Sequence, residues 1–342
     1  MAGSGGGATQ GDGSGTGPAA PGPAAAMDPR ALYPLLASRP RTAAVVGATF
    51  IAFSGIFFRF SGATPSTATV FRTGFALPFL WLLRRYEERR VGPRARRARM
   101  LAAAAGLFFA LDLLLWMHAV VEVGAGLATV LANMQVVIVA AAGWLLLGER
   151  PSGRLLAAIP VVVAGAACIS GAFESDAYGA NPALGVVFGL GAATAYSAYL
   201  LLIRRGSGGG RVFGPLFDAS AVCAVTGLAI GLLLGEFDPM PGPTALWWLL
   251  VVALTSQVAG YGLINVSLPR LPAALTSLLL LVQPIVTVVA AALILGEAPS
   301  ALQLTGCALI LGGLLVATAP VGRVRSAMAP RGDATAPSIG GE

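Results

Sequence analysis

The chain has 342 residues, of which 56% are hydrophobic and only 11% are charged, whereas a soluble domain carries about a quarter charged residues. This composition predicts a membrane protein with several spans. The net charge of +7 comes from a basic set that is entirely arginine, and without lysine the chain can form neither an ATP-binding P-loop nor a Schiff base, which excludes ATP-driven pumping and retinal photochemistry.

The N-terminal residues 1–42 are expected to form a cytoplasmic tail without a fold. Residues 1–26 are almost all Gly, Ala, Pro, Ser and Thr, so they cannot build a core. They also lack the apolar segment of a signal peptide, and Met27 is an alternative start to Met1. We expect residues 320–342 to be a second cytoplasmic tail without a fold.

Ten apolar runs lie between these tails, each long enough to cross about 30 Å of hydrocarbon, which takes about 20 residues. They predict an all-α membrane protein with ten transmembrane helices, over residues 43–60, 67–83, 101–119, 125–147, 154–172, 183–203, 213–234, 245–266, 271–295 and 301–319.

The chain repeats itself at an offset of 148 residues. We therefore predict two repeats of five spans, at residues 43–172 and 183–319. Because five is odd, the two copies should insert upside down relative to each other around a central cavity, as in many secondary transporters. The matching residues are Ala125, Leu127, Leu131, Gln135, Ala142, Leu145, Leu147, Gly148, Glu149, Pro151, Ser152 and Gly165, which recur as Ala273, Leu275, Leu279, Gln283, Ala290, Leu293, Leu295, Gly296, Glu297, Pro299, Ser300 and Gly313.

The arginines gather in loops on one side of this arrangement. Eight lie in residues 84–99, between spans 2 and 3, and the positive-inside rule makes that loop cytoplasmic, with both termini inside. Glu122, which should face out, corresponds to Arg270, which should face in, as inverted insertion requires. Because the arginines lie beside spans, we expect no nucleic-acid partner. The loops expected outside instead hold Glu122, Glu174, Asp176, Glu236, Asp238 and Glu297.

The reactive residues are sparse, which limits the chemistry. Cys168, Cys223 and Cys307 all fall within predicted spans, so neither a disulfide framework nor a metal site is expected. The chain has one histidine, which excludes a His-x-x-x-His zinc protease, and no span carries a Gly-x-Ser-x-Gly nucleophile turn. An aspartate protease would require Asp112 and Asp218 to meet.

Span 3 carries the densest group of titratable side chains. Asp112 lies near its centre, followed by Trp116, His118 and Glu122. An ionisable group in the membrane costs about 2.5–3.5 kcal/mol on insertion scales, so it indicates function by default. We interpret Asp112 and His118 as candidates for a proton or polar relay, since histidine titrates near neutral pH, and Trp116 as a candidate substrate contact. The alternative is that Asp112 pairs with a donor and Glu122 is an ordinary loop acid.

Polar side chains in four other spans are candidates for binding substrate. Symmetry-related Gln135 and Gln283 in spans 4 and 9 should face the shared axis near the midplane, or else clamp the two halves together. In span 8, Gln257, Tyr261 and Asn265 follow one another at steps of four residues, so they should form one polar stripe on the helix. We expect this stripe to face a cavity, and the alternative is that it makes hydrogen bonds to a neighbouring helix. Tyr196 and Tyr199 in span 6 are interpreted as cavity residues, with an interfacial aromatic belt as the alternative. The full set is Gln135, Gln283, Asn133, Tyr196, Tyr199, Gln257, Tyr261 and Asn265.

Arg72 in span 2 is a further relay candidate. Its expected partners are Asp112 or Asp218, and the alternative is that its long side chain reaches the outer surface. Pro284 directly follows Gln283 and permits a bend in span 9. Span 4 has Val136 at the corresponding position, which leaves no proline to bend it.

Several segments resemble the ten-span EamA branch of the drug/metabolite transporter superfamily. They are Thr64-Pro65-Ser66 with Phe71-Arg72, the turn Leu147-Gly148-Glu149-Arg150-Pro151 with its echo Leu295-Gly296-Glu297, and Tyr196-Ser197-Ala198-Tyr199 ending in Arg204-Arg205. The resemblance covers residues 43–319. It implies two inverted five-span bundles around a cavity that opens to alternate sides, with Gln135 and Gln283 on the spans that line it.

We therefore predict a secondary transporter, an exporter rather than an importer, of a small amino-acid-like or amphipathic metabolite. It should work by alternating access, without ATP or a cofactor, and with proton coupling as an open alternative. An intramembrane enzyme or sensor on the same fold is the other hypothesis. The basic residues are all arginine and Ala and Gly are abundant, which indicates a bacterium with a high GC content. We expect the protein to lie in its inner membrane. The oligomeric state is not predicted.

Overall fold

The computed structural model describes residues 38–147, 152–207, 211–267, 270–271 and 279–318. Most of both expected tails, the alternative start at Met27 and the Glu149 turn lie outside the described residues. The described residues form helices joined by loops, with no strand among them. The all-helical prediction is therefore confirmed for this part of the chain.

The helices of the first half coincide with the first five apolar runs. Their order is α2 (Pro40–Ala52), α3 (Ser54–Ser61), α4 (Pro65–Val91), α5 (Arg96–Val123), α6 (Ala125–Ala132), α7 (Gln135–Leu147) and α8 (Gly153–Ile169). Runs 1 and 4 each correspond to two helices in series.

The second half follows the same plan over the last five runs. Its elements are α9 (Pro182–Gly206), α10 (Phe213–Leu234), α11 (Pro243–Val252), the π-helical segment η2 (Ala253–Gly260), α12 (Tyr261–Ser267), α14 (Val282–Ala290), the π-helical segment η4 (Ala291–Leu295) and α15 (Ala301–Thr318). Among the described residues, six helical stretches are long and apolar enough to cross a membrane, at Pro40–Ser61, Arg96–Val123, Pro182–Gly206, Phe213–Leu234, Pro243–Ser267 and Ala301–Thr318.

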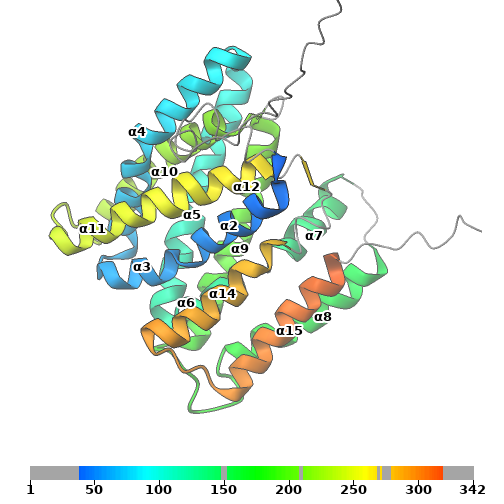
Figure 1. Cartoon of the computed structure of the whole chain (residues 1–342). Coiled ribbons are helices and arrows are strands. Elements are labelled where there is room, and N and C mark those ends of the chain that lie inside the picture. Colours follow the sequence, from blue (N-terminus) through cyan, green and yellow to red (C-terminus); the bar gives the residue numbers. More distant parts are fainter. Residues whose placement is uncertain (1–37, 148–151, 208–210, 268–269, 272–278, 319–342) are drawn as a thin grey trace, which may run out of the picture.

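The bundle combines elements of both halves. Helix α5 lies between α9 and α10, and α10 also packs along α4, while α8 and α15 form a pair side by side (Figure 1). Small residues allow the close approach in this pair, because the α-carbons of Gly165 and Gly306 each face the other's carbonyl oxygen. The outside of the bundle carries large apolar side chains, such as Leu233 at 85% exposed and Leu293 at 81% exposed, as expected of a surface that contacts lipid.

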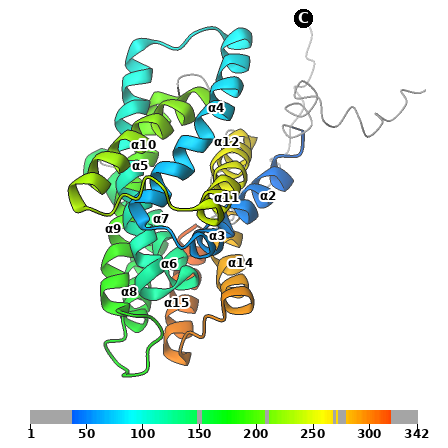
Figure 2. The same cartoon turned by 90° about the vertical axis from the view of Figure 1, so that its left-hand side faces the viewer.

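One end of the bundle, here called the arginine end, holds the loop between α4 and α5 and the start of α10 (Figure 2). Asp218 forms ion pairs with Arg94 and with Arg84, the latter at 3.1 Å. The Glu87 carboxylate accepts hydrogen bonds from the first backbone N–H groups of α10, including that of Val212 at 2.7 Å. This carboxylate supplies the helix with the acceptor that its free N-terminal N–H groups need.

The opposite end, here called the acidic end, brings together the loops that were expected outside. Glu236 follows α10 and contacts the start of α4, and the carbonyl of Glu122 accepts a hydrogen bond from the Asn181 N–H at 3.2 Å. Glu174 accepts a hydrogen bond from the hydroxyl of Ser300. Arginine-rich and acidic loops thus lie at opposite ends of the bundle, in agreement with the sequence pattern.

Two of the long spans break at equivalent places. Between α6 and α7 the chain turns at Asn133 and Met134, where the Met134 N–H bonds the Leu131 carbonyl three residues back. The second half turns at Leu281, which is 148 residues after Asn133. Span 4 therefore breaks although Val136 stands where span 9 has Pro284. The break is made by a short turn in which the hydrogen bond joins residues three apart.

Candidate functional site

A cavity of about 80 Å³ lies where the broken helices of the two halves meet. Its wall combines α2 and α3, α4, α5, the turn before α7, α9, α12 and the turn before α14. The residues that line it are Ile51, Ser54, Arg72, Asp112, Leu113, Trp116, Ala132, Asn133, Gln135, Tyr196, Tyr261, Ile264, Leu280 and Gln283.

Arg72 provides a fixed cation in this wall. Its side chain is 1% exposed, and a buried guanidinium needs hydrogen-bond acceptors. Its Nε donates to Oε1 of Gln257 at 3.2 Å, and its Nη1 donates to the hydroxyl of Ser54 at 3.0 Å. Gln257 is held in turn by its own amide, which donates to the hydroxyl of Ser220 at 3.0 Å.

Asp112 supplies a carboxyl group to the same cavity. Asp112 is buried, with only 6% of its surface exposed, and it interacts electrostatically with Arg72. No described residue forms a direct hydrogen bond or ion pair with its carboxylate. The acid of span 3 is therefore available to a ligand in the cavity.

Two equivalent amides, one from each repeat, lie in the polar part of the wall together with Asn133. Gln135 opens α7 and Gln283 lies in the first turn of α14, each two residues after the break in its span. Within the described part of the chain, Oε1 of Gln135 is buried without a hydrogen-bond partner. An acceptor left in this state costs free energy, so the site offers an unused acceptor to a donor group on a ligand.

Aromatic rings form the remainder of the wall and its support. Tyr196 faces the cavity and stacks on Tyr199, with ring centroids 5.3 Å apart, and Tyr199 stacks on Phe109 at 4.7 Å. Tyr261 and Phe109 form a T-shaped pair, with ring centroids 5.5 Å apart. Tyr199 thus supports the wall from an apolar cluster.

The structure brings together eight of the twelve residues singled out from the sequence, namely Arg72, Asp112, Trp116, Asn133, Gln135, Tyr196, Tyr261 and Gln283. Gln257 and Tyr199 lie directly behind the wall, and Asn265 is not part of the lining. The π-helical segment η2 includes Gln257 and ends at Gly260, directly before Tyr261. Its wider turns change the direction in which successive side chains point, so Gln257, Tyr261 and Asn265 do not form the single stripe expected of a regular α-helix.

Asp112 and Asp218 occupy separate sites, so the structure does not form the pair that an aspartate protease would need.

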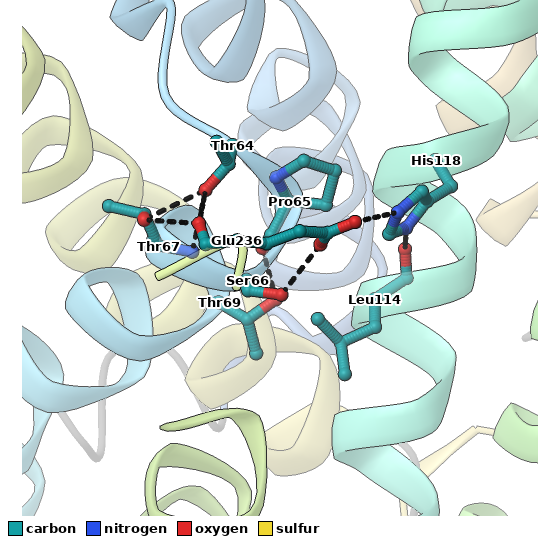
Figure 3. Close-up of polar contacts among 8 residues, drawn as sticks. All are labelled: Thr64, Pro65, Ser66, Thr67, Thr69, Leu114, His118 and Glu236. Carbon is teal, nitrogen blue, oxygen red and sulfur yellow. Dashed lines mark hydrogen bonds and ion pairs between the residues drawn. The ribbon is translucent and has the colours of Figure 1, made fainter. Parts of the chain in front are cut away.

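His118 lies outside the cavity, at the acidic end. Its Nδ1 is 2.8 Å from the carbonyl oxygen of Leu114, and its Nε2 is 3.3 Å from Oε1 of Glu236. The other carboxylate oxygen of Glu236 accepts a hydrogen bond from the Ser66 hydroxyl at 2.9 Å, and its backbone carbonyl accepts one from the Thr64 hydroxyl at 2.5 Å (Figure 3). Glu236 therefore ties α5 to the start of α4.

Three residues of structural importance went unrecognised in the sequence. Ser54 and Ser220 accept hydrogen bonds that hold Arg72 and Gln257, and nothing in their local sequence distinguishes them from other small residues in apolar helices. Glu297 is the third, because its carboxylate accepts hydrogen bonds from the backbone N–H groups of Ala125 and Gly126. The sequence places it in the repeated Leu-Gly-Glu turn and among the outer acids, but neither observation predicts that it caps a helix of the other half.

No group of three or more His, Cys, Asp or Glu side chains that could hold a metal ion occurs among the described residues. The site is thus built from one cation, one carboxylate, three amides and a set of aromatic rings. It is suited to binding a small polar ligand.

A family model supplies the identification. The model of the EamA-like transporter family matches the chain twice, over residues 41–171 and 183–319. The chain belongs to the EamA-like transporter family. This confirms the resemblance found in the sequence and the duplication on which it depended, and it makes the chain a multi-pass protein of a membrane transporter family.

The other comparisons concern the fold. One similar crystal structure, described only as that of a protein, shares 20% sequence identity, with a TM-score of 0.55 over 82% of this chain and 97% of its own. At that identity the likeness extends to the fold alone. No curated protein matches the chain. What this EamA-like transporter carries must be argued from its own cavity.

Proposed function

We propose that the chain is a secondary transporter that moves a small polar metabolite by alternating access through the cavity between its two halves. The observation that carries this proposal is the meeting of Gln135 and Gln283 in one cavity wall. They are equivalent residues of the two repeats, and each follows a break in its span. Broken helices at the interface of two repeats are where secondary transporters bind substrate and coupling ions.

The proposed architecture is ten spans in two inverted repeats, 43–172 and 183–319, with the arginine end and both termini in the cytoplasm. The separation of arginine-rich from acidic loops supports this orientation. We propose that the protein resides in the bacterial inner membrane. We expect transport to proceed without ATP or a cofactor.

The cavity chemistry favours a compound with both acidic and basic groups. Arg72 can face a carboxylate, Asp112 can face an ammonium group, and the Gln135 acceptor can take a further N–H or O–H donor. A volume of about 80 Å³ holds only several waters, so the substrate is either very small or enters a more open conformation. An amino-acid-like metabolite, carried outward, fits this set of groups.

The test is flux into and out of proteoliposomes that contain the purified full-length chain. A thermal-shift screen of small metabolites comes first, because a ligand that binds only the folded state raises its stability by mass action. The compound it selects should cross the membrane down its gradient, and Arg72→Gln should abolish that flux. The matched control is Arg59→Gln, which removes the same charge from an exposed position on α3. An intramembrane enzyme or sensor would move nothing in this assay, and that outcome would refute the proposal.

Topology is tested with single cysteines in a chain freed of Cys168, Cys223 and Cys307. A cysteine at Asp176 should react with an impermeant label from outside intact cells, whereas one at Arg97 should react only after permeabilisation. Labelling of both positions from the same side would contradict the proposed arrangement.

A further inference from the structure

A groove at the arginine end lies between the first turns of α5 and the first half of α10. Its volume is about 620 Å³, far larger than the central cavity. Arginines line one part of it and apolar side chains the other, and the complete lining is Arg94, Arg96, Arg99, Met100, Ala103, Asp218, Ala221 and Val222. The transport cycle proposed above makes no use of this groove.

The polar part of the groove carries excess positive charge. Asp218 is its only acid, and that carboxylate is already engaged by Arg94 and by Arg84 from α4. The side chains of Arg96 and Arg99 are exposed, and they lie three residues apart on one face of α5. The groove therefore presents two cations that Asp218 does not neutralise.

The start of α5 adds to this positive potential. Its N-cap residue, Ala95, provides no side-chain acceptor, and the first turn of the helix contains no acidic residue. A helix N-terminus carries partial positive charge and free N–H groups, so clustered arginines there are unfavourable unless an anion is close. This end of α5 is built in the opposite way to the start of α10, which Glu87 caps.

Arg94 gives independent evidence for a missing acceptor. Its side chain is 1% exposed and lines the groove. Only Nη2 is paired, with Asp218, while Nε and Nη1 are buried and have no partner among the described residues. Buried guanidinium nitrogens without acceptors are costly, so Nε and Nη1 of Arg94 favour a further acceptor at this site besides Asp218.

The apolar part of the groove identifies the kind of anion. Met100, Ala103, Ala221 and Val222 continue from the arginines along α5 and α10, and Met100 is 62% exposed. A soluble anion would leave this surface uncovered, whereas a phospholipid places a phosphate and acyl chains on the two parts together. Basic pockets between helices at the cytoplasmic side of membranes bind such headgroups.

We propose that this groove is a specific site for an anionic phospholipid, whose headgroup phosphate contacts Arg96 and Arg99 at the start of α5. The acyl chains lie along Met100, Ala103 and Val222. The phosphate also reduces the unfavourable charge around Arg94. The site is separate from the central cavity and does not depend on which metabolite the protein carries.

The test is native mass spectrometry of the delipidated full-length chain with added phosphatidylglycerol or phosphatidylcholine of identical acyl chains. Phosphatidylglycerol should bind more tightly. Arg96→Gln with Arg99→Gln should weaken its binding by about 25-fold, since each basic residue near an anionic lipid contributes about fivefold. The matched control is Arg89→Gln with Arg97→Gln, which removes equal charge from exposed positions outside the groove lining and should change binding by less than about twofold.

A steric variant checks the apolar part of the groove. Ala103→Phe should fill it and weaken phosphatidylglycerol binding with no change in charge. Melting temperatures close to that of the wild-type protein will establish that each variant is folded. Equal binding of the two lipids, or equal loss in both arginine pairs, would overturn the proposal. Displacement of the lipid by inorganic phosphate at similar concentration would show a free-anion site and overturn it as well.

Discussion

The carboxylate of Glu297 accepts a hydrogen bond from the backbone N–H of Ala125, with 2.7 Å between Oε1 and the nitrogen. Its Oε2 accepts a second from the N–H of Gly126 at 3.1 Å. The turn after span 9 thus caps the first helix of span 4, which has no side-chain cap of its own. Gly124 makes this approach possible, because a Cβ there would lie 2.8 Å from Oε2. The repeated Leu-Gly-Glu turn of the second half therefore fastens the two halves together at the acidic end.

Removal of the Glu297 carboxylate should destabilise this junction. Glu297→Ala leaves two buried N–H groups at a helix N-terminus without acceptors, and we expect a loss of about 2 kcal/mol. Glu297→Gln should lose less, because its amide oxygen can still accept one bond. The measurement is the melting temperature in detergent, with Glu174→Gln as the control at the same end. Equal melting temperatures for wild type and Glu297→Ala would contradict the cap.

Gln257 should act by positioning Arg72. Gln257→Leu removes the acceptor for the Arg72 Nε and leaves a buried N–H unpaired, so we expect flux of the identified substrate to fall by about tenfold. Thr255→Val is the matched control, because the Thr255 hydroxyl bonds only its own helix, at the carbonyl of Val251. A similar fall in both variants would indicate general damage to the span instead of loss of a positioned cation.

Asp112 should give transport its dependence on pH. An intramembrane carboxylate that faces the cavity can take up and release a proton during the cycle, and Asp112→Asn removes that proton site with little change in shape. We expect the variant to show flatter flux between pH 5 and 8 than the wild-type protein in proteoliposomes. Identical pH profiles for the two proteins would eliminate the proton relay.

The fold was largely accessible from the sequence because membrane burial imposes a simple rule. A long apolar run has to be a helix, since no water is present to bond its backbone, and each of the ten runs coincides with helix in the described residues. The breaks were not accessible in the same way. Asn133 turns the chain without a proline or glycine at the turn itself, so only the packed structure shows where α6 ends.

The candidate site was predictable where polarity alone decides. Arg72, Asp112, Gln135 and Gln283 are costly in an apolar span, and all four line one cavity. Polarity could not separate the wall from its support, so Gln257, a neighbour of the cation, was grouped with residues that face the cavity. Distinguishing these roles requires the direction of each side chain, which the π-helical turns of η2 change.

Close packing of α8 on α15 should tolerate no side chain at Gly165. A Cβ there would lie 2.7 Å from the carbonyl oxygen of Gly306 and 2.8 Å from Cγ1 of Ile310, so the helices would have to separate. We expect Gly165→Ala to cost about 1–3 kcal/mol and to lower the melting temperature. Gly312→Ala on α15 is the control, because its Cβ would meet nothing within 4 Å. A melting temperature for Gly165→Ala as high as that of the control would refute this contact.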